Sequence, residues 1–472
     1  MKTLILSILI FAGLIFRNYD AFSQFNPEQV YTQQELQQDF MVLRNKFETK
    51  LANLYLYTPK SRLDKIFDSL YLHISPMTEI EFYNYITPLL SIIKDGHSII
   101  LPSPQLIRYH KQNSVYFPFH VFIDEGKMFI LENYSDDSTF YAGAEILSIN
   151  NINADLILQD MNRKQVRDGY NTTFPAWIYN HYFRNYYNLF YGYPDFYFLK
   201  IKNTDGSIAF HEVKAVSQDS LTARRKSRYP SSMESNSGKG IYLEAKNNIA
   251  VLTIKSWDKK QINKIYHQKF KKEIDEIFSE LHQKQINYLV IDLRDNQGGN
   301  MNYGDYLLGC LLNTQYQYAA SIEKVKSHGD TIQNLKSING KFLKMHEPQK
   351  QNYQGAIYVL VNGGSFSNSG IFCSRLDAYQ RAVFIGEETG GNNTVLTGVF
   401  RVGRKTVLPN TKIVCDKADN RIVISDLKNN SGHGVMPDYR IVPDINDRIA
   451  KKDVVMEFVL DLITQTIETD DH

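Results

Sequence analysis

Cysteine is scarce in this chain of 472 residues, and the three that occur, Cys310, Cys373 and Cys415, are widely separated. No paired C-x-x-C motif exists, which excludes the common cysteine-rich metal sites, and an odd count gives no disulfide framework. An excess of one charge is also missing, because 53 Lys and Arg face 51 Asp and Glu. Nothing in this balance points to nucleic acid or to an acidic membrane surface as a partner.

Long apolar runs are missing except at the start of the chain. There, Lys2 precedes the apolar run Leu4–Phe16, and small residues follow at Ala21 and Ser23. This pattern predicts a signal peptide over residues 1–23. The mature protein is then exported, periplasmic or secreted if the source is bacterial, with no membrane contact beyond this segment. The run is short for a membrane span, although an uncleaved anchor is an alternative.

The remaining length is enough for two or three domains. Tyrosine and phenylalanine are abundant, at 31 and 27, which predicts large aromatic cores. Changes of pattern along the chain predict a helical N-terminal region over 24–112, a β-rich module over 113–218, a polar linker over 219–240, an α/β core over 241–446 and a C-terminal helix over 447–472.

The helical region ends in a motif with one histidine. Apolar residues recur every three or four positions over Gln33–Ile93, as in amphipathic helices. Lys94-Asp95-Gly96-His97-Ser98 follows and leads into the strand-like Ile99–Leu101. A single histidine is most often a surface or core residue, so His97 alone indicates little.

The β-rich module contains a glycine, an alternating strand and an Asn turn over Gly143–Asn150. This segment resembles part of a PDZ domain, which binds an extended peptide at a sheet edge. An aromatic insertion follows from Tyr170 to Phe198 and includes Trp177. Packing in a core or between domains is the ordinary role of such residues, and lining a peptide groove is the alternative.

Strands and amphipathic helices alternate from Ile241 onward. The strand-like segments Ile249–Ile254, Tyr288–Leu293 and Ala356–Val361 are separated by helical patterns, which predicts a mainly parallel sheet with crossover helices. Ile413–Cys415 and Arg421–Ser425 are expected to add a hairpin-like pair.

A serine cluster follows the strand Ala356–Val361. Ser365, Ser367 and Ser369 lie on a Gly-Gly turn before the helical pattern Ile371–Tyr379. Such a turn exposes a hydroxyl, and the free N–H groups of the helix start can stabilise an oxyanion. Helix capping by serine is the alternative. Another turn, Asp295-Asn296-Gln297-Gly298-Gly299, resembles a weak phosphate loop but lacks the Lys-Ser/Thr ending of a P-loop.

Four motifs occur in a fixed order: DLRDNQGG, VNGGSFSNSG, IGEETGG and GHGVMPD. Together they resemble the serine peptidase family of the C-terminal processing (tail-specific) peptidases and the tricorn core protease. The resemblance implies an α/β, ClpP/crotonase-like catalytic core and no metal or organic cofactor. It also implies Ser367 as the nucleophile, with the N–H groups of Gly299 and Asn368 as the oxyanion hole.

The general base departs from half of this family. Tail-specific peptidases use a lysine where this chain has Asn392, which cannot take a proton at neutral pH. The resemblance to tricorn instead implies His97 as the base, with His433 as a rival. The acidic residue that the tricorn branch has before GVMPD is absent. Ser431 is one candidate for orienting the base, and the others are Glu387, Glu388, Asp426 and Asp95.

These features predict an exported serine endopeptidase that acts on peptide or protein substrates through an acyl-enzyme. A non-catalytic peptide-binding protein of the same fold is the alternative, supported by the missing lysine and the missing carboxylate. Ester hydrolysis is a third reading, since fold does not fix reaction. Relatives often assemble, so a homo-oligomer is open, whereas cleavage specificity cannot be deduced from the sequence.

Overall fold

The computed structural model describes residues 25–230, 238–325, 332–334, 340–398, 405–416 and 418–470. The predicted signal peptide 1–23 and residues 231–237 of the predicted linker lie outside these ranges. No helix within the described ranges combines the length and apolar character needed to span a bilayer.

The C-terminal half is built on a six-stranded sheet, in the order β12 (Ile241–Lys246), β13 (Ile249–Ile254), β14 (Tyr288–Asp292), β17 (Ala356–Val361), β18 (Val383–Gly386) and β23 (Tyr439–Arg440). β12 is antiparallel to β13, and the other neighbours are parallel. The predicted α/β core with a mainly parallel sheet is confirmed.

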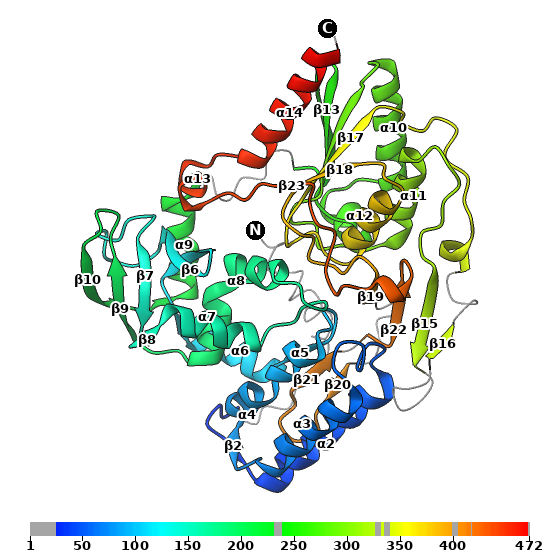
Figure 1. Cartoon of the computed structure of the whole chain (residues 1–472). Coiled ribbons are helices and arrows are strands. Elements are labelled where there is room, and N and C mark those ends of the chain that lie inside the picture. The colour runs from blue at the N-terminus through cyan, green and yellow to red at the C-terminus, as the bar shows by residue number, and fades with distance from the viewer. Residues whose placement is uncertain are drawn as a thin grey trace.

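Helices cover both faces of this sheet (Figure 1). One face packs on α10 (Phe270–Gln283), α11 (Met301–Leu311) and α12 (Asn368–Ala378), and the other on α14 (Val454–Asp470), which follows the short α13 (Ile445–Ala450). Successive strand residues serve opposite faces, as Val359 packs with α10–α12 and Leu360 with α14. Burial on both faces explains the nearly continuous apolar runs of these strands.

The N-terminal region is helical as predicted, with α2 (Gln33–Lys50), α3 (Lys60–Leu72), α4 (Glu79–Ile86), α5 (Pro88–Ile93) and α6 (Pro104–Asn113). The small strands β1 (Val30–Tyr31) and β2 (Met77–Thr78) pair with each other. Thr32 and Glu35 form a capping box that begins α2. The apolar stripe of α2, including Phe40 and Phe47, is fully buried.

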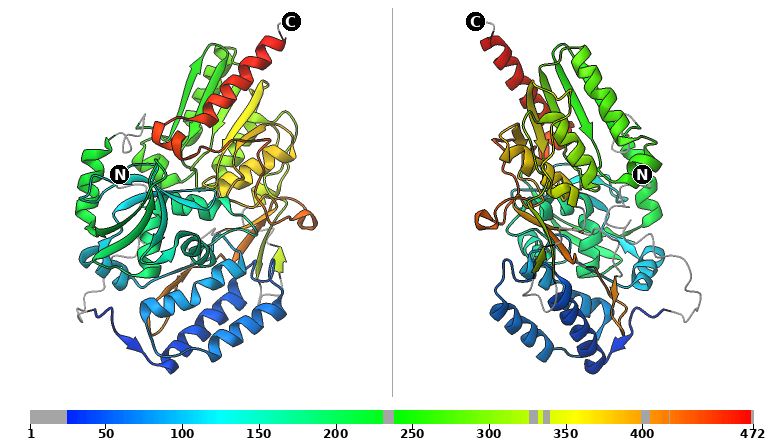
Figure 2. Two further views of the ribbon diagram at one scale, coloured as in Figure 1. Left: turned by 60° about the vertical axis from the view of Figure 1, so that its left-hand side comes forward. Right: turned by 90° about the vertical axis from the view of Figure 1, so that its right-hand side faces the viewer.

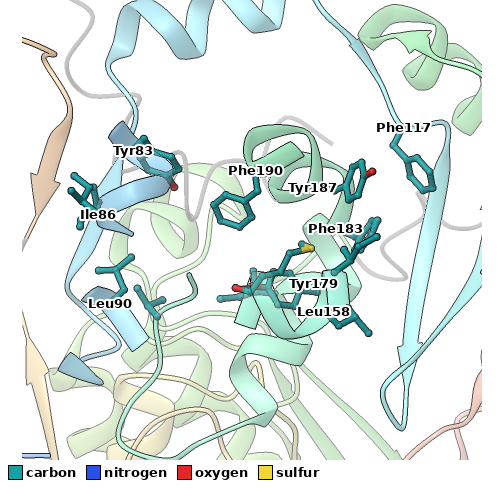
Figure 3. Close-up of a cluster of buried hydrophobic side chains, with 14 of the residues drawn as sticks. Tyr83, Ile86, Leu90, Phe117, Leu158, Tyr179, Phe183, Tyr187 and Phe190 are labelled. Carbon is teal, nitrogen blue, oxygen red and sulfur yellow. Dashed lines mark hydrogen bonds between the residues drawn. The ribbon is translucent and has the colours of Figure 1, made fainter. Parts of the chain in front are cut away.

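The middle module has a sheet in the order β10 (Ile208–Lys214), β9 (Phe196–Lys202), β7 (Glu145–Ile149), β6 (Lys127–Asn133) and β5 (Phe119–Asp124), with β8 (Ile152–Asn153) beside β7. α7 (Ala154–Arg163) and α8 (Thr173–Tyr191) belong to it, and β4 (Val115–Tyr116) pairs with β11 (Val216–Ser217). The aromatic insertion forms α8, whose Phe183, Tyr187 and Phe190 lie in the same core as Tyr83 and Leu90 of the N-terminal helices (Figure 3). Its aromatic rings are therefore mainly core residues.

A long loop of the C-terminal half, which includes residues 405–416, extends from the α/β core to the N-terminal helices (Figure 2). It contains β20 (Thr406–Val407) and β21 (Val414–Asp416), and β21 pairs with β3 (Ile99–Leu101) directly after the His97 motif. At the tip, the buried Asp39 carboxylate of α2 accepts hydrogen bonds from both backbone and side chain of Asn410 and Thr411. These contacts join the N-terminal helices to the core.

Two sequence predictions are wrong in detail. The predicted hairpin-like pair does not form, because β21 pairs with β3 and β20, while β22 (Asn420–Val423) pairs with β15 (Ser321–Val325) and β19 (Val395–Gly398). β16 (Ile332–Asn334) completes the latter sheet.

Part of the predicted linker is the helix α9 (Gln218–Arg228), capped by Ser217 and anchored by the buried Leu221. Arg224 and Arg228 of α9 donate to backbone oxygens of residues 133–135, which explains the basic composition.

Asp39→Ala is expected to lower the free energy of unfolding by about 3 kcal/mol, because it leaves buried donors of Asn410 and Thr411 without a charged acceptor. Urea unfolding followed by circular dichroism measures this. Asp68→Ala is the matched control, since its carboxylate is 62% exposed and pairs only with Arg44, and it should cost less than about 1 kcal/mol. Equal losses in the two variants would contradict the anchoring role of Asp39.

Candidate active site

The serine turn presents one hydroxyl and buries the other two. Ser365 Oγ donates to the carbonyl of Leu293 at 2.8 Å. Ser369 Oγ donates to the carbonyl of Asn296 at 2.6 Å and accepts from Trp257 Nε1 at 2.8 Å. Ser367 is half-buried and precedes α12 with φ 55° and ψ −118°. A positive φ is strained for a residue with a side chain, and such strain is concentrated at functional sites.

His97 faces this serine, with its Nε2 atom 3.0 Å from Ser367 Oγ. The loop that carries it begins where α5 ends, at Lys94 with a left-handed φ of 61°. Asp95 Oδ1 accepts from the His97 N–H at 3.1 Å and from Thr397 Oγ1 at 3.0 Å. The pairing of β3 with β21 then fixes the chain after His97. Two residues far apart in the sequence are thus held within hydrogen-bond distance.

The other ring nitrogen of His97, Nδ1, is buried and has no hydrogen-bond partner among the residues that the structure describes. The ring is instead held by a stack of aromatic side chains. Its centre lies 4.7 Å from that of Phe366, and Phe366 stacks on Phe174 at 4.1 Å with an angle of 5° between the planes. Phe174 stacks in turn on Trp177, whose Nε1 donates to Asp295 Oδ1 at 2.7 Å. The stack joins the loop of residues 94–98, which carries His97 and is called the base loop below, to the DNQGG turn.

Burial sets the electrostatics of the site. It lowers the pKa of His97 from its ordinary 6.5 to about 4, so the imidazole is neutral at neutral pH. Burial raises the pKa of Asp95 to about 6. Burial and the Asp95 carboxylate raise the pKa of Asp168 to about 7. Near neutral pH the Asp168 carboxyl group is therefore partly protonated, which reduces the negative charge behind the loop.

The two amides predicted to hold an oxyanion belong to Asn368, which directly follows Ser367, and to Gly299, which follows a glycine that packs against Ser367. A Cβ on Gly298 would come within 2.7 Å of Asn368 N and of Ser367 Cβ, so the Gly-Gly turn packs directly against the serine. Gly299 continues this turn with φ 140°. Neither the Gly299 N–H nor the Asn368 N–H donates to another described residue. Both donors are free for a ligand.

Ser431 makes no hydrogen bond to His97 in the described part of the chain. It is exposed, and its hydroxyl accepts from the His433 N–H at 3.3 Å. His433 itself lies with Nδ1 3.1 Å from Glu388 Oε1. The buried Asn392 is structural, since its Oδ1 accepts from the N–H groups of Thr394 and Val395. A lysine ammonium could not replace that acceptor.

Asp168 and Phe174 lie at the site and belong to none of the four motifs, whereas Phe366 lies within VNGGSFSNSG. Asp168 is buried, and its Oδ1 accepts from the Gly96 N–H at 2.8 Å. It belongs to the middle module, and the only local signal is the Asp168-Gly169 pair, which is typical of a tight turn. Phe366 lies between two of the cluster serines, and only the fold shows that its ring stacks on His97.

A cleft of about 2590 Å³ opens over this arrangement. Its walls come from all parts of the chain and include His97, Phe122, Gly299, Ser367 and Arg448. Within the described ranges, no three His, Cys, Asp or Glu side chains gather in a way that would hold a metal ion. The groups that line the site are suited to acyl transfer by a serine hydroxyl.

Comparisons with known proteins agree with this chemistry. Residues 248–442 match the model of Peptidase family S41. A tail-specific protease of Haemophilus influenzae is 28% identical over 109 residues, which are 23% of this chain and 13% of that protein. The chain thus aligns with only a small part of that relative.

Among solved structures, mature CPAF aligns with a TM-score of 0.63 and 15% identity, over 93% of this chain and 99% of that one. Mature CPAF complexed with lactacystin gives 0.63 and 14%, over the same shares. At these identities the likeness shows a common fold, and it extends beyond the segment 248–442.

The His97 imidazole is expected to titrate with a pKa of about 4 in the folded protein, because burial penalises the charged form. Histidine-selective NMR over pH 3–8 measures this, with His97→Gln used to assign the signal. As the unfolded chain takes up this proton near pH 6.5, the contribution of His97 to stability falls as the pH drops from 6.5 to 4. A His97 signal that titrates at 6 or above would contradict the buried site.

Proposed function

We propose that the protein is a serine endopeptidase of family S41 that acts through an acyl-enzyme, since residues 248–442 match the model of Peptidase family S41. One observation carries the proposal: His97 Nε2 lies 3.0 Å from Ser367 Oγ. A neutral imidazole at this distance can take the hydroxyl proton as the oxygen attacks a carbonyl carbon. Ser367 is then the nucleophile and His97 the general base.

The proposed cycle has two halves. In the first, Ser367 Oγ bonds to the substrate carbonyl carbon, and the N–H groups of Gly299 and Asn368 donate to the resulting oxyanion. The His97 imidazolium returns its proton to the leaving amine as the peptide bond breaks. In the second half, water attacks the acyl carbon while His97 takes its proton, and the ester bond to Ser367 Oγ then breaks as the imidazolium returns that proton to Oγ and the acid product leaves. The Asn368 position is fixed by its side chain, whose Oδ1 accepts from Tyr318 Oη at 2.7 Å.

The aromatic stack takes the place of a third catalytic group in this proposal. With Nδ1 unpartnered, the His97 ring is oriented by Phe366, which is itself backed by Phe174. The backbone of the loop is held separately, through Asp95 and Asp168. Orientation and proton transfer are therefore assigned to different residues.

Export and peptide presentation extend the proposal. Residues 1–23 have the pattern of a signal peptide, which would deliver the mature chain to the periplasm or outside the cell. Residues 113–218 are proposed to act as a PDZ-like module that presents an extended peptide to the cleft. The open edge strand β10 offers backbone groups for such an added strand.

A non-catalytic peptide-binding protein is the second candidate. The observation that favours it is the buried His97 Nδ1 with no acceptor, since an imidazolium formed there lacks a carboxylate partner. The strained backbone of Ser367 favours the enzyme, because a binding protein has no need to keep it.

A fluorophosphonate probe is expected to label Ser367 in the mature protein and to leave Ser367→Ala unlabelled, because this hydroxyl has the His97 imidazole beside it and lines the cleft. Mass spectrometry of tryptic peptides locates the label. Cleavage of a peptide library by the wild type, and not by Ser367→Ala, then separates a peptidase from an esterase. A folded wild type that takes no label would favour the binding protein.

The two histidines provide the matched pair for this experiment. His97→Gln should slow labelling by at least about 100-fold, whereas His433→Gln should leave the rate nearly unchanged. The reverse order of effects would transfer the role of base to His433.

Phe174→Leu is expected to slow labelling about tenfold with little change in melting temperature, since it removes the flat ring that backs Phe366 and leaves the apolar volume. Stopped-time labelling with mass detection gives the rate. Phe183→Leu, in the same helix but in the core away from His97, is the control. If both variants lose the same fraction of the labelling rate, the effect comes from a general loss of packing in α8 and not from the stack on His97.

A further inference from the structure

A second, smaller pocket of about 300 Å³ lies behind the base loop. Its walls are the end of α5, the end of α7 and the segment that leads to α8, and they include Lys94, Asn162, Arg163, Arg167 and Tyr170. No acidic side chain lines it. The pocket is separate from the cleft over Ser367.

Three of the side chains that line the pocket are cations. Among the described residues, no Asp or Glu carboxylate forms an ion pair with Lys94, Arg163 or Arg167. Arg167 Nη2 donates to the Asn162 carbonyl at 2.5 Å, but the buried Arg167 Nε has no partner in the described chain. The Lys94 ammonium lies 4.0 Å from the centre of the Tyr170 ring.

Holding the half-buried Lys94 and Arg167 cations near each other costs free energy. Burial lowers the pKa of Lys94, and the positive charges of Arg167 and Arg62 lower it further. Burial also lowers the pKa of Arg167. A bound anion would offset both effects, because it supplies the missing negative charge and an acceptor for Arg167 Nε.

We propose that Lys94, Arg163 and Arg167 form a binding site for a small tetrahedral oxyanion of the phosphate type. Guanidinium groups match such an anion through paired N–H donors, and the lysine adds a compact charge. The concave wall, with Tyr170 beside Lys94, reduces competition from water. The pocket volume suits a small ion or one phosphoryl group with its waters.

An anion bound in this pocket would stabilise the position of the base loop relative to the segment around Asp168. The Lys94 carbonyl accepts from the Gly169 N–H at 3.0 Å, and the Gly96 N–H donates to Asp168. Lys94 and Arg167 therefore stand on the two segments that these bonds join. A ligand that contacts both side chains adds a third link, and occupancy should accelerate proton transfer by His97. This coupling rests on the proposed function, whereas binding does not.

Calorimetric titration of the whole mature protein with sodium phosphate tests the site, at an ionic strength held constant with sodium chloride. One saturable ion per chain is expected. Arg167→Gln should weaken binding about tenfold or more, and Lys111→Gln, an exposed lysine on α6, should leave it unchanged. No saturable heat in the wild type, or equal affinity in all variants, would overturn the proposal.

Arg163→Gln is the second variant, because Arg167 also supports the Asn162 carbonyl and its loss could disturb folding. The Arg163 side chain belongs to an exposed residue, so this change should weaken phosphate binding without lowering the melting temperature. A phosphoserine peptide provides a second titrant. Tighter binding of the peptide than of phosphate assigns the site to phosphorylated chains, and the opposite order assigns it to the free ion.

The coupling is measured separately as the rate of fluorophosphonate labelling with and without saturating phosphate. An increase in the wild type that is absent in Arg163→Gln supports it. An unchanged rate with normal calorimetric binding overturns the coupling and keeps the site. Because calorimetry needs no activity, a failure of the peptidase proposal would not be mistaken for a failure of the anion site.

Discussion

The close approach at Gly96 is the contact on which the arrangement of the site depends. A Cβ at this position would lie 2.8 Å from Asp168 Oδ1 and 2.9 Å from Phe366 Cζ, so no larger residue fits without displacing one of them. Asp168 belongs to the middle module, Phe366 to the core and Gly96 to the end of the N-terminal region. Three parts of the chain thus meet at one backbone atom, and the neighbouring residue is His97.

This meeting point explains why the N-terminal helices are tied so firmly to the core. The β3–β21 pairing and the Asp39 hydrogen bonds each hold the N-terminal region against the same loop of the C-terminal half. Both bear on the position of His97, because β3 begins two residues after it. A site assembled from such distant segments requires the whole chain to fold, since neither half contains both the hydroxyl and the imidazole.

Local sequence patterns are sufficient to predict the strands that are buried on both faces of the sheet. β13, β14 and β17 are apolar on both faces, and the turn that carries Ser367 follows from its glycines. The pairing of β21 could not be deduced in this way, because the strand chooses β3, more than three hundred residues earlier, over the nearby β22.

The same reason limits what the sequence says about the site. Motifs in the sequence predict Ser367 and His97, and the structure has His97 Nε2 3.0 Å from Ser367 Oγ. Phe174 and Asp168 carry no signature, since their importance comes only from what they touch in the fold. Ser431 was proposed by position in a motif, yet its hydroxyl is used by the adjacent turn.

In the proposed mechanism, the His97 base is oriented by stacking on Phe366 and not by a carboxylate, and this difference affects its pKa. A carboxylate at Nδ1 would both orient the imidazole and stabilise the imidazolium, and it would raise the pKa. Stacking on Phe366 supplies the orientation, but the attraction between a cation and a ring face is worth only about 0.5–2 kcal/mol. The low pKa of about 4 keeps His97 neutral in mildly acidic surroundings, at the cost of a weaker base. In the proposed mechanism, the pair Asp95 and Asp168 acts on the loop backbone and leaves the ring itself to the aromatic stack. In this proposed mechanism, His97 is a weaker base that stays neutral over a wide range of pH.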